Sequence, residues 1–143
     1  MTKVPKKISA VLFYNKEGEI LLQDRRGISK WGEDYGFFGG KVEEGETFEQ
    51  CARREMREEL EIENVPLINY KTYKHKNPET GIEVERSVYL SGMPNNVGTL
   101  VCHEGLAEVR RFDNSLNLKF IPGFGSLLEE IYLHLKSESK VIC

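Results

Sequence analysis

The stretch GGKVEEGETFEQCARREMREELEIE, residues 39–63, constrains the fold more than any other part of the chain. Two glycines end a short apolar run, and Thr47 with a glutamine three residues later makes a capping-box pattern that starts a helix. Glu55, Glu58 and Glu59 then fall within this helix, although like charges three and four residues apart destabilise an isolated helix. The segment therefore predicts a strand, a loop and a helix that carries clustered carboxylates.

A helical wheel at 100° per residue places two of these carboxylates among apolar side chains. The apolar arc consists of Phe48, Cys51, Ala52, Met56 and Leu60. Glu55 and Glu59 fall inside this arc and Glu58 lies at its edge, whereas Arg53 and Arg57 occupy the opposite side. A solvated charged helix, the alternative, would keep its glutamates on the wet side. Because a buried carboxylate either takes up a proton or meets a cation, and clustered carboxylates suit Mg²⁺ or Mn²⁺, the wheel favours a metal site.

The rest of the chain predicts strands around this unit and a second helix. We expect strands at 8–14, 19–25, 36–42, 66–76, 82–92 and 107–112, a loop at 26–35 and an amphipathic helix at 125–136. No repeat, linker or low-complexity tract interrupts the pattern, so we expect a single domain over residues 1–143. Strands and helices without a regular βαβ period indicate an α/β fold, with helices packed on a mixed β-sheet.

Composition makes several partners improbable. The chain has 20 Lys and Arg against 23 Asp and Glu, a net charge of −3, so no global charge favours specific nucleic-acid or membrane binding. Its apolar runs are all shorter than the roughly 20 residues of a membrane span. Cys51, Cys102 and Cys143 are widely spaced and odd in number, which is typical of free thiols in a reducing compartment. We therefore expect a cytoplasmic protein.

The segment from Gly40 to Ile62 resembles the Nudix box, the signature of Nudix hydrolases. The box reads G, five residues, E, seven residues, then R-E-U-x-E-E-x-G-U, where U is a bulky aliphatic residue. Its fixed positions are matched here by Gly40, Glu46, Arg54, Glu55, Met56, Glu58, Glu59 and Ile62. Glu61 departs from the box, which has glycine there to end the helix in a left-handed conformation. That conformation would cost Glu61 on the order of 1 kcal/mol, so the alternative is a helix that runs one turn further and ends near Asn64.

The resemblance implies an α/β/α sandwich and a hydrolase that needs Mg²⁺ or Mn²⁺. Such enzymes cleave a diphosphate linkage in a nucleoside diphosphate linked to another group. Glu55, Glu58 and Glu59 would hold the metal, and Glu55 or Glu59 would also be a candidate base for the attacking water. The carbonyl of Gly39 would be a further ligand, with no side chain there to keep metal and phosphate away. Arg54 would hold the carboxylates in place.

Two residues outside the box extend the implied site. Family members take a further acid from a later loop, and Glu104 corresponds to it better than Glu108; an ordinary exposed acid is the alternative. Arg26, at the end of the second expected strand, is similar in place to a phosphate-binding arginine of members that cleave nucleoside triphosphates. An exposed charge at the end of a hairpin is the alternative for Arg26.

Substrate-binding residues are expected among the aromatic and amide side chains near these positions. Trp31, Tyr35 and Phe37 are candidates for stacking on a base, although Phe37 is equally suited to the core and Trp31 to anchoring a loop. Asn114 and Asn117 lie where some family members read the edge of a purine, and we carry Asn117 forward as a candidate.

The expected substrate is a small-molecule nucleotide. A nucleoside triphosphate, ordinary or oxidised, is preferred because the chain is small, has no additional domain and carries Arg26. ADP-ribose, dinucleoside polyphosphates and nucleotide sugars stay open as alternatives, because substrate choice in this family lies in variable loops. A non-catalytic nucleotide-binding module is less favoured, since such proteins typically lack one of the carboxylates that are all present here. Many small family members form homodimers, so a homodimer is compatible with the resemblance.

Overall fold

The structure is a computed structural model that describes residues 6–30, 32–76, 78, 80–121, 124 and 126–141. Its main elements are β1 (Lys6–Tyr14), β2 (Glu19–Asp24), β3 (Tyr35–Gly36), β4 (Phe38–Lys41), α1 (Phe48–Leu60), β5 (Ile68–Lys76), β6 (Glu83–Gly92), β7 (Leu106–Arg111) and α2 (Leu127–Ser137), with short 3₁₀ helices at Val97–Thr99 and Phe112–Asn114. The predicted strands and helices are confirmed, except that the strand expected at 36–42 is divided into β3 and β4. In the described part of the chain, neither α-helix has the length and hydropathy that a membrane crossing requires.

The strands form one mixed sheet in which β1 and β2 each pair with three other strands. Strand β1 pairs in parallel with β6, which pairs with β5 at one edge, while β3 and β7 both pair with β2. Both β2 and β4 pair with β1, at different ends of it: β2 opposite Phe13 and Tyr14, and β4 opposite residues 8–11. The glycine pair of β4 therefore lies beside the middle of the sheet.

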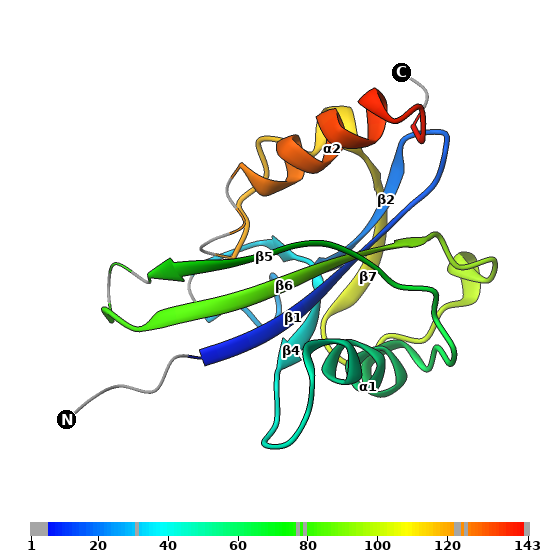
Figure 1. Cartoon of the computed structure of the whole chain (residues 1–143). Coiled ribbons are helices and arrows are strands. Elements are labelled where there is room, and N and C mark those ends of the chain that lie inside the picture. Colours follow the sequence, from blue (N-terminus) through cyan, green and yellow to red (C-terminus); the bar gives the residue numbers. More distant parts are fainter. Residues whose placement is uncertain are drawn as a thin grey trace.

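The two helices cover opposite faces of this sheet (Figure 1). Alternate residues of β1 point to opposite sides, as the period of two along a strand requires. Ala10 and Leu12 belong to the core packed under α2, whereas Val11 and Phe13 belong to the core packed under α1. The structure is therefore the expected α/β/α sandwich, with a separate apolar core on each face of the sheet.

Helix α1 begins where the sequence predicts and ends earlier than one alternative required. Thr47 is its N-cap and forms the capping box in both directions. The helix ends at Leu60, and Glu61 takes the left-handed conformation with φ 55°. The expectation of a helix running to Asn64 was therefore wrong; Asn64 is also left-handed, with φ 52°, but in the following loop. The Glu61 side chain lies 2.6 Å from Nε2 of His103, so the strained residue gains a partner from a distant loop.

Candidate active site

Helix α1 presents its three box glutamates in three different environments. Glu59 is buried, with 4% of its surface exposed, and its Oε2 accepts a hydrogen bond from the Gly39 N–H at 3.3 Å. The Glu55 side chain is 13% exposed, while that of Glu58 is 60% exposed. The wheel prediction is confirmed, since Glu55 and Glu59 interrupt the apolar face of the helix and Glu58 lies at its edge.

The carboxylates of Glu55, Glu59 and Glu104 act on one another electrostatically. Burial raises the pKa of Glu59 to about 9, and the negative charges of Glu55 and Glu104 add to the rise. Burial also raises the pKa of Glu55, although the neighbouring Arg54 opposes this. Among the described residues, no Lys, Arg or His forms an ion pair with Glu59. A buried carboxylate beside two other carboxylates strongly favours either a proton or a metal cation.

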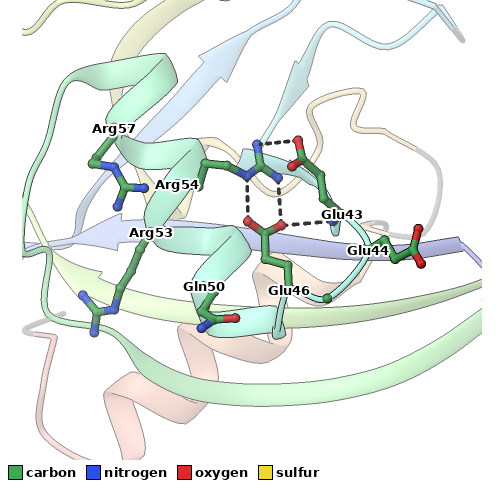
Figure 2. A pocket seen from close by; sticks show the side chains of 8 residues that line it. Glu43, Glu44, Glu46, Gln50, Arg53, Arg54 and Arg57 are labelled. Atoms are coloured by element: carbon green, nitrogen blue, oxygen red, sulfur yellow. Dashed lines mark hydrogen bonds and ion pairs between the residues drawn. The ribbon is translucent and has the colours of Figure 1, made fainter.

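Arg54 joins the loop before α1 to the carboxylates on the helix. Its guanidinium contacts both oxygens of Glu46, at 2.7 and 3.0 Å (Figure 2). It also donates to the Lys41 carbonyl at 3.0 Å. Nη1 reaches Glu55 at 3.0 Å and Glu58 at 3.2 Å. The hydrogen bonds from Arg54 hold the pKa of Glu46 at about 2. Arg54 thus links the loop before α1 to Glu55 and Glu58 of the helix.

The hollow drawn in Figure 2 lies on the outer side of α1. It has a volume of about 390 Å³, and its lining includes Arg53 and Arg57 from the solvent side of the helix and Glu43 and Glu44 from the loop. Of the residues that the sequence assigned to the site, only Arg54 borders it. This hollow is therefore separate from the carboxylates of the candidate active site.

The two glycines of β4 lie close to two different neighbours. Gly39 has φ 147°, and a side chain there would collide with the backbone carbonyl of Ser9 in β1. A side chain at Gly40 would instead collide with the carboxylate of Glu55. Close packing against β1 is thus a reason for glycine at position 39, and the access of metal and phosphate there stays a prediction. It is at Gly40 that the missing side chain makes room for a carboxylate.

The loop before β7 carries the additional acid. The His103 N–H donates to the Glu59 carbonyl at 2.8 Å, which ties this loop to the end of α1 next to Glu61. Glu104 follows immediately and raises the pKa of Glu59 through its charge and a hydrogen bond between the two side chains. Glu108 lies further along in β7, opposite Leu22, and pairs with an arginine of its own strand. The structure thus brings Glu104, and not Glu108, to the carboxylate cluster.

A cavity of about 380 Å³ opens beside the carboxylates on the α2 face of the sheet. Gly39, Gly40 and Glu104 line it, together with the rings of Phe37 and Phe124 from the core under α2. Its only acidic lining residue among those described is Glu104, whereas five basic residues take part. These are Lys6, Arg25, Lys30, Lys41 and Arg86. Positive charge beside aromatic rings suits an anionic ligand that also carries a planar group.

Arg26 and Tyr35 lie together away from the cavity lining. Arg26 is 58% exposed and pairs with Asp24 at 2.7 Å. The Tyr35 ring is buried and has the guanidinium groups of Arg26 and Arg110 at 5.5 and 5.4 Å from its centroid. Neither residue lines the cavity. Their predicted roles in substrate binding gain no support from this placement.

The other predicted substrate-binding residues are placed unequally. Phe37 packs on Phe124 in the core, with ring centroids 4.5 Å apart, and also lines the cavity; its stacking on a base stays a prediction. Asn114 and Asn117 are exposed near the turn after β7 and do not line the cavity. Trp31 lies outside the described residues.

Two buried arginines in the cavity were not predicted from the sequence. Arg25 donates from Nε to Glu33 at 2.8 Å, and Arg86 is only 3% exposed. A signal for Arg86 exists, because Val84 and Val88 share its side of β6 by the period of two, and both are buried. A charged residue in an apolar alternation is the same signal that singled out the glutamates of α1. Arg25 has no comparable signal, since it directly follows the end of β2.

The predicted metal ligands do not form a complete set of donors as the side chains stand. No group of three or more His, Cys, Asp or Glu in the described residues is arranged to hold a metal ion. Glu58 is turned toward Arg54, which leaves Glu55, Glu59 and Glu104 as the inward-facing acids. Carboxylate oxygens are the ligands that Mg²⁺ and Mn²⁺ prefer. The donor chemistry therefore fits such an ion.

Comparison with known proteins identifies the family. The NUDIX domain model matches residues 4–118, and the chain therefore belongs to the Nudix family. It is 33% identical over 109 residues to the CTP pyrophosphohydrolase of Escherichia coli (strain K12), covering 75% of each chain. It is 32% identical over 72 residues to the 8-oxo-dGTP diphosphatase of Haemophilus influenzae (strain ATCC 51907 / DSM 11121 / KW20 / Rd), a match that spans 50% of this chain and only 53% of that relative. The enzyme class is thus that of the Nudix diphosphohydrolases.

Solved structures agree with this assignment. The solution structure of the E. coli ORF135 protein has 26% sequence identity and a TM-score of 0.73, covering 93% of this chain and 91% of that one. The crystal structure of a MutT NUDIX hydrolase from Burkholderia pseudomallei has 23% identity and a TM-score of 0.73, covering 90% and 99%, and shows the same fold. Nudix hydrolases generally use divalent metal ions, in agreement with the donor chemistry of the carboxylates.

Proposed function

We propose that this chain hydrolyses nucleoside triphosphates, ordinary or oxidised, to the monophosphate and pyrophosphate, with the help of Mg²⁺ or Mn²⁺. The observation that carries the proposal is that the cluster of Glu59, Glu55 and Glu104 lies beside a basic, aromatic cavity, which Glu104 lines. Acidic groups alone would repel a polyphosphate, whereas acids that hold metal beside a basic cavity would bind it. Two relatives are named for nucleoside triphosphates, CTP and 8-oxo-dGTP, which supports this substrate class.

The carboxylates are the proposed metal ligands. Glu55, Glu58 and Glu59 would hold the ion, with Glu104 and the Gly39 carbonyl as additional oxygen donors. When bound, Mg²⁺ or Mn²⁺ supplies positive charge that offsets the negative charge of the diphosphate and favours attack by water. Glu58 would have to leave Arg54, 3.2 Å away, to take part. Arg54 would keep Glu55 in place through the contact from the same Nη1.

The chain's own residues supply the remaining steps. Glu55 or Glu59 would accept the proton of the attacking water, since both lie in the carboxylate cluster with Glu104, which lines the cavity. Lys30 and Lys41 line the cavity and would bind phosphate oxygens. Phe37 and Phe124 offer ring surfaces against which a base would pack.

The proposal is tested by incubating the protein with a panel of nucleotides and nucleotide conjugates, with and without Mg²⁺, and separating the products by chromatography. The variant E59Q removes a proposed ligand and base while keeping its size. The variant E49Q is the matched control, because Glu49 is an exposed acid in the first turn of the same helix. We expect metal-dependent release of pyrophosphate by the wild type and E49Q, and a loss of roughly a thousand-fold in E59Q.

Other outcomes would redirect the proposal. Cleavage of ADP-ribose, a dinucleoside polyphosphate or a nucleotide sugar, without cleavage of triphosphates, would change the substrate class and leave the carboxylates in their role. Nucleotide binding without turnover would favour the non-catalytic module. Equal activity in E59Q and E49Q would refute the assignment of Glu59.

A further inference from the structure

Arg86 is a buried cation for which the described part of the protein offers little compensation. It lies on β6 with 3% of its surface exposed and lines the cavity. Its hydrogen bond within the described residues runs from Nη1 to the Tyr73 hydroxyl at 3.2 Å, and Nε has no partner there. No carboxylate of the described residues lies within ion-pair distance of it. A buried polar group that lacks a partner is costly, so its retention calls for a ligand.

Arg25, a second arginine that lines the same cavity, has partners for its charge and its hydrogen-bond donors. Arg25 pairs with the buried carboxylate of Glu33 at 2.8 Å and donates from Nη1 to Gln23 at 2.7 Å. Arg25 is therefore held by neighbours on β2 and the following loop, and its charge is matched. Arg86 has no equivalent of Glu33. Among the described residues that line the cavity, Nε of Arg86 is the buried side-chain donor without a hydrogen-bond partner.

The surroundings of Arg86 are aromatic. Its guanidinium carbon lies 4.3 Å from the centroid of the Phe124 ring, which in turn lies 4.5 Å from that of Phe37. The hydrogen bond to Tyr73 uses Nη1, so the edge of the guanidinium formed by Nε and Nη2 is free of hydrogen bonds to the described residues. A planar ring that packs on these phenylalanines would lie in the plane of the Arg86 guanidinium and face its Nε–Nη2 edge.

The sheet register separates Arg86 from the carboxylate half of the site. Arg86 is opposite Ile8 of β1, and Ile8 is opposite Lys41 of β4, next to Gly40. Two strand spacings amount to about 10 Å, so a group held by Arg86 lies that far across the sheet from β4. This separation leaves room for a sugar between a base at Arg86 and phosphates near the glycines.

We propose that Arg86 selects the base of the substrate, by donating from Nε and Nη2 to a base edge that presents two adjacent hydrogen-bond acceptors. The proposal rests on the proposed function, because it places the base of a nucleotide in the cavity. Guanine has such an edge in O6 and N7, and cytosine has one in O2 and N3. In adenine each ring acceptor of the amino edge adjoins a donor, and in uracil and thymine an N–H separates the two carbonyls.

Oxidation of guanine removes the edge that Arg86 requires. In 8-oxoguanine N7 carries a hydrogen, so O6 is left without an adjacent acceptor. The expected substrates are therefore nucleotides of cytosine or unmodified guanine, with adenine, uracil, thymine and 8-oxoguanine disfavoured. A bidentate arginine contact discriminates between bases by roughly 10- to 100-fold.

The test compares R86K, which keeps the charge but loses the forked donors, with the wild type. R111K is the matched control, because Arg111 is an exposed arginine of β7 that pairs with Asp113 and does not line the cavity. We would measure kcat/KM for CTP, GTP, ATP, UTP, dGTP and 8-oxo-dGTP. The wild type and R111K should prefer CTP or GTP by roughly 10- to 100-fold, and R86K should lose that preference. The CTP and GTP arms decide which of the two bases the cavity takes.

Calorimetric binding of CMP, GMP, AMP and UMP separates this proposal from the proposed function, because it requires neither hydrolysis nor metal. The same order of preference should appear in binding, including in the inactive variant E59Q. A uniform loss across all bases in R86K would place a phosphate at Arg86 and overturn the proposal. An unchanged preference in R86K would also overturn it, as would a wild type that favours AMP or UMP or binds none of the four.

A stability measurement keeps the test informative if a variant folds poorly. R86M removes the uncompensated charge and keeps an unbranched apolar side chain, so its melting temperature should equal or exceed that of the wild type. A large fall in melting temperature for R86M, with R111K unchanged, would assign Arg86 to the core and count against a role in recognition.

Discussion

The carboxylate face of α1 and the cavity on the α2 side differ in how the chain builds them. Three of the four proposed acids lie within the 23 residues from Gly40 to Ile62, on one helix whose cap and arginine are encoded nearby. The cavity draws its lining from β1, β2, β4, β6 and the segment before α2. A local motif can thus keep the metal chemistry fixed, while substitutions scattered over the fold change the substrate.

The largest expected effect tests the boundary between the two regions, where the two glycines lie side by side. G39A would force a side chain into the Ser9 carbonyl at φ 147°, and backbone in the central strand has no room to move. We expect it to lower the free energy of unfolding by about 3 kcal/mol or more. G40A meets only the end of the Glu55 side chain, so it should spare stability and lower kcat. Urea unfolding and steady-state kinetics of both variants check this. Equal destabilisation would contradict the inference that Gly39 packs against backbone and Gly40 only against the Glu55 side chain.

The second effect concerns the protonation of the buried Glu59 side chain in the metal-free protein. Its folded pKa of about 9 lies above the ordinary 4.5, so the folded state holds the proton more tightly than the unfolded state. The free energy of unfolding should therefore fall as pH rises between about 5 and 9, by at most about 1.4 kcal/mol per pH unit from this group. E59Q should flatten the slope. Urea unfolding at pH 6 and pH 8.5 measures it, and Mg²⁺ should restore stability to the wild type more than to E59Q.

The third effect addresses the cavity alone. F37L shortens a ring that lines the cavity, and we expect KM to rise about tenfold with kcat unchanged, because loss of stacking weakens ground state and transition state alike. F112L is the control, since Phe112 is a buried ring stacked on Tyr132 at 4.8 Å and does not line the cavity. Similar losses of stability with a change in KM for F37L alone would confirm the separation. A fall in kcat for F37L would show that the two regions are coupled.

The carboxylate part of the site could be predicted from the sequence because the patterns that place it lie within one short segment. A period of 3.6 residues and a capping box fix which side of α1 is buried, and the position of Glu59 followed directly. Arg86 carries a signal of the same kind, a charged residue within the apolar alternation of β6, although it was not predicted. Both cases depend only on residues within one element.

Other features depend on which distant residues meet. Arg25 and Arg26 are neighbours in sequence, and only the buried Glu33 and the paired Asp24 decide which of them enters the cavity. The contact between Glu61 and His103 joins residues 42 positions apart. No periodicity within a segment carries such information, so the sequence could not supply it.

The smallest expected effect tests how far the two regions depend on the Glu61 contact. E61G restores the glycine of the box and relieves the left-handed strain, on the order of 1 kcal/mol, but it gives the unfolded chain more freedom and removes a surface contact. These terms nearly cancel, so the free energy of unfolding should change by less than about 1 kcal/mol. H103A removes the same contact without relieving the strain, so its stability should fall slightly.

Metal affinity shows whether the contact between Glu61 and His103 affects the proposed metal ligands or only the stability of the fold. Without this contact, the loop that carries Glu104 would still be tied to α1 by the His103 N–H bond to the Glu59 carbonyl, 2.8 Å long, and by the hydrogen bond between the Glu104 and Glu59 side chains. We expect Mn²⁺ to bind a few-fold more weakly to both E61G and H103A, because an additional loop freedom must be lost on binding. Mn²⁺ titration followed by electron paramagnetic resonance measures this directly. If E61G binds Mn²⁺ as tightly as the wild type, the contact serves only to accommodate Glu61 at the helix end. If E61G and H103A weaken Mn²⁺ binding equally and the double variant weakens it no further, the contact positions Glu104.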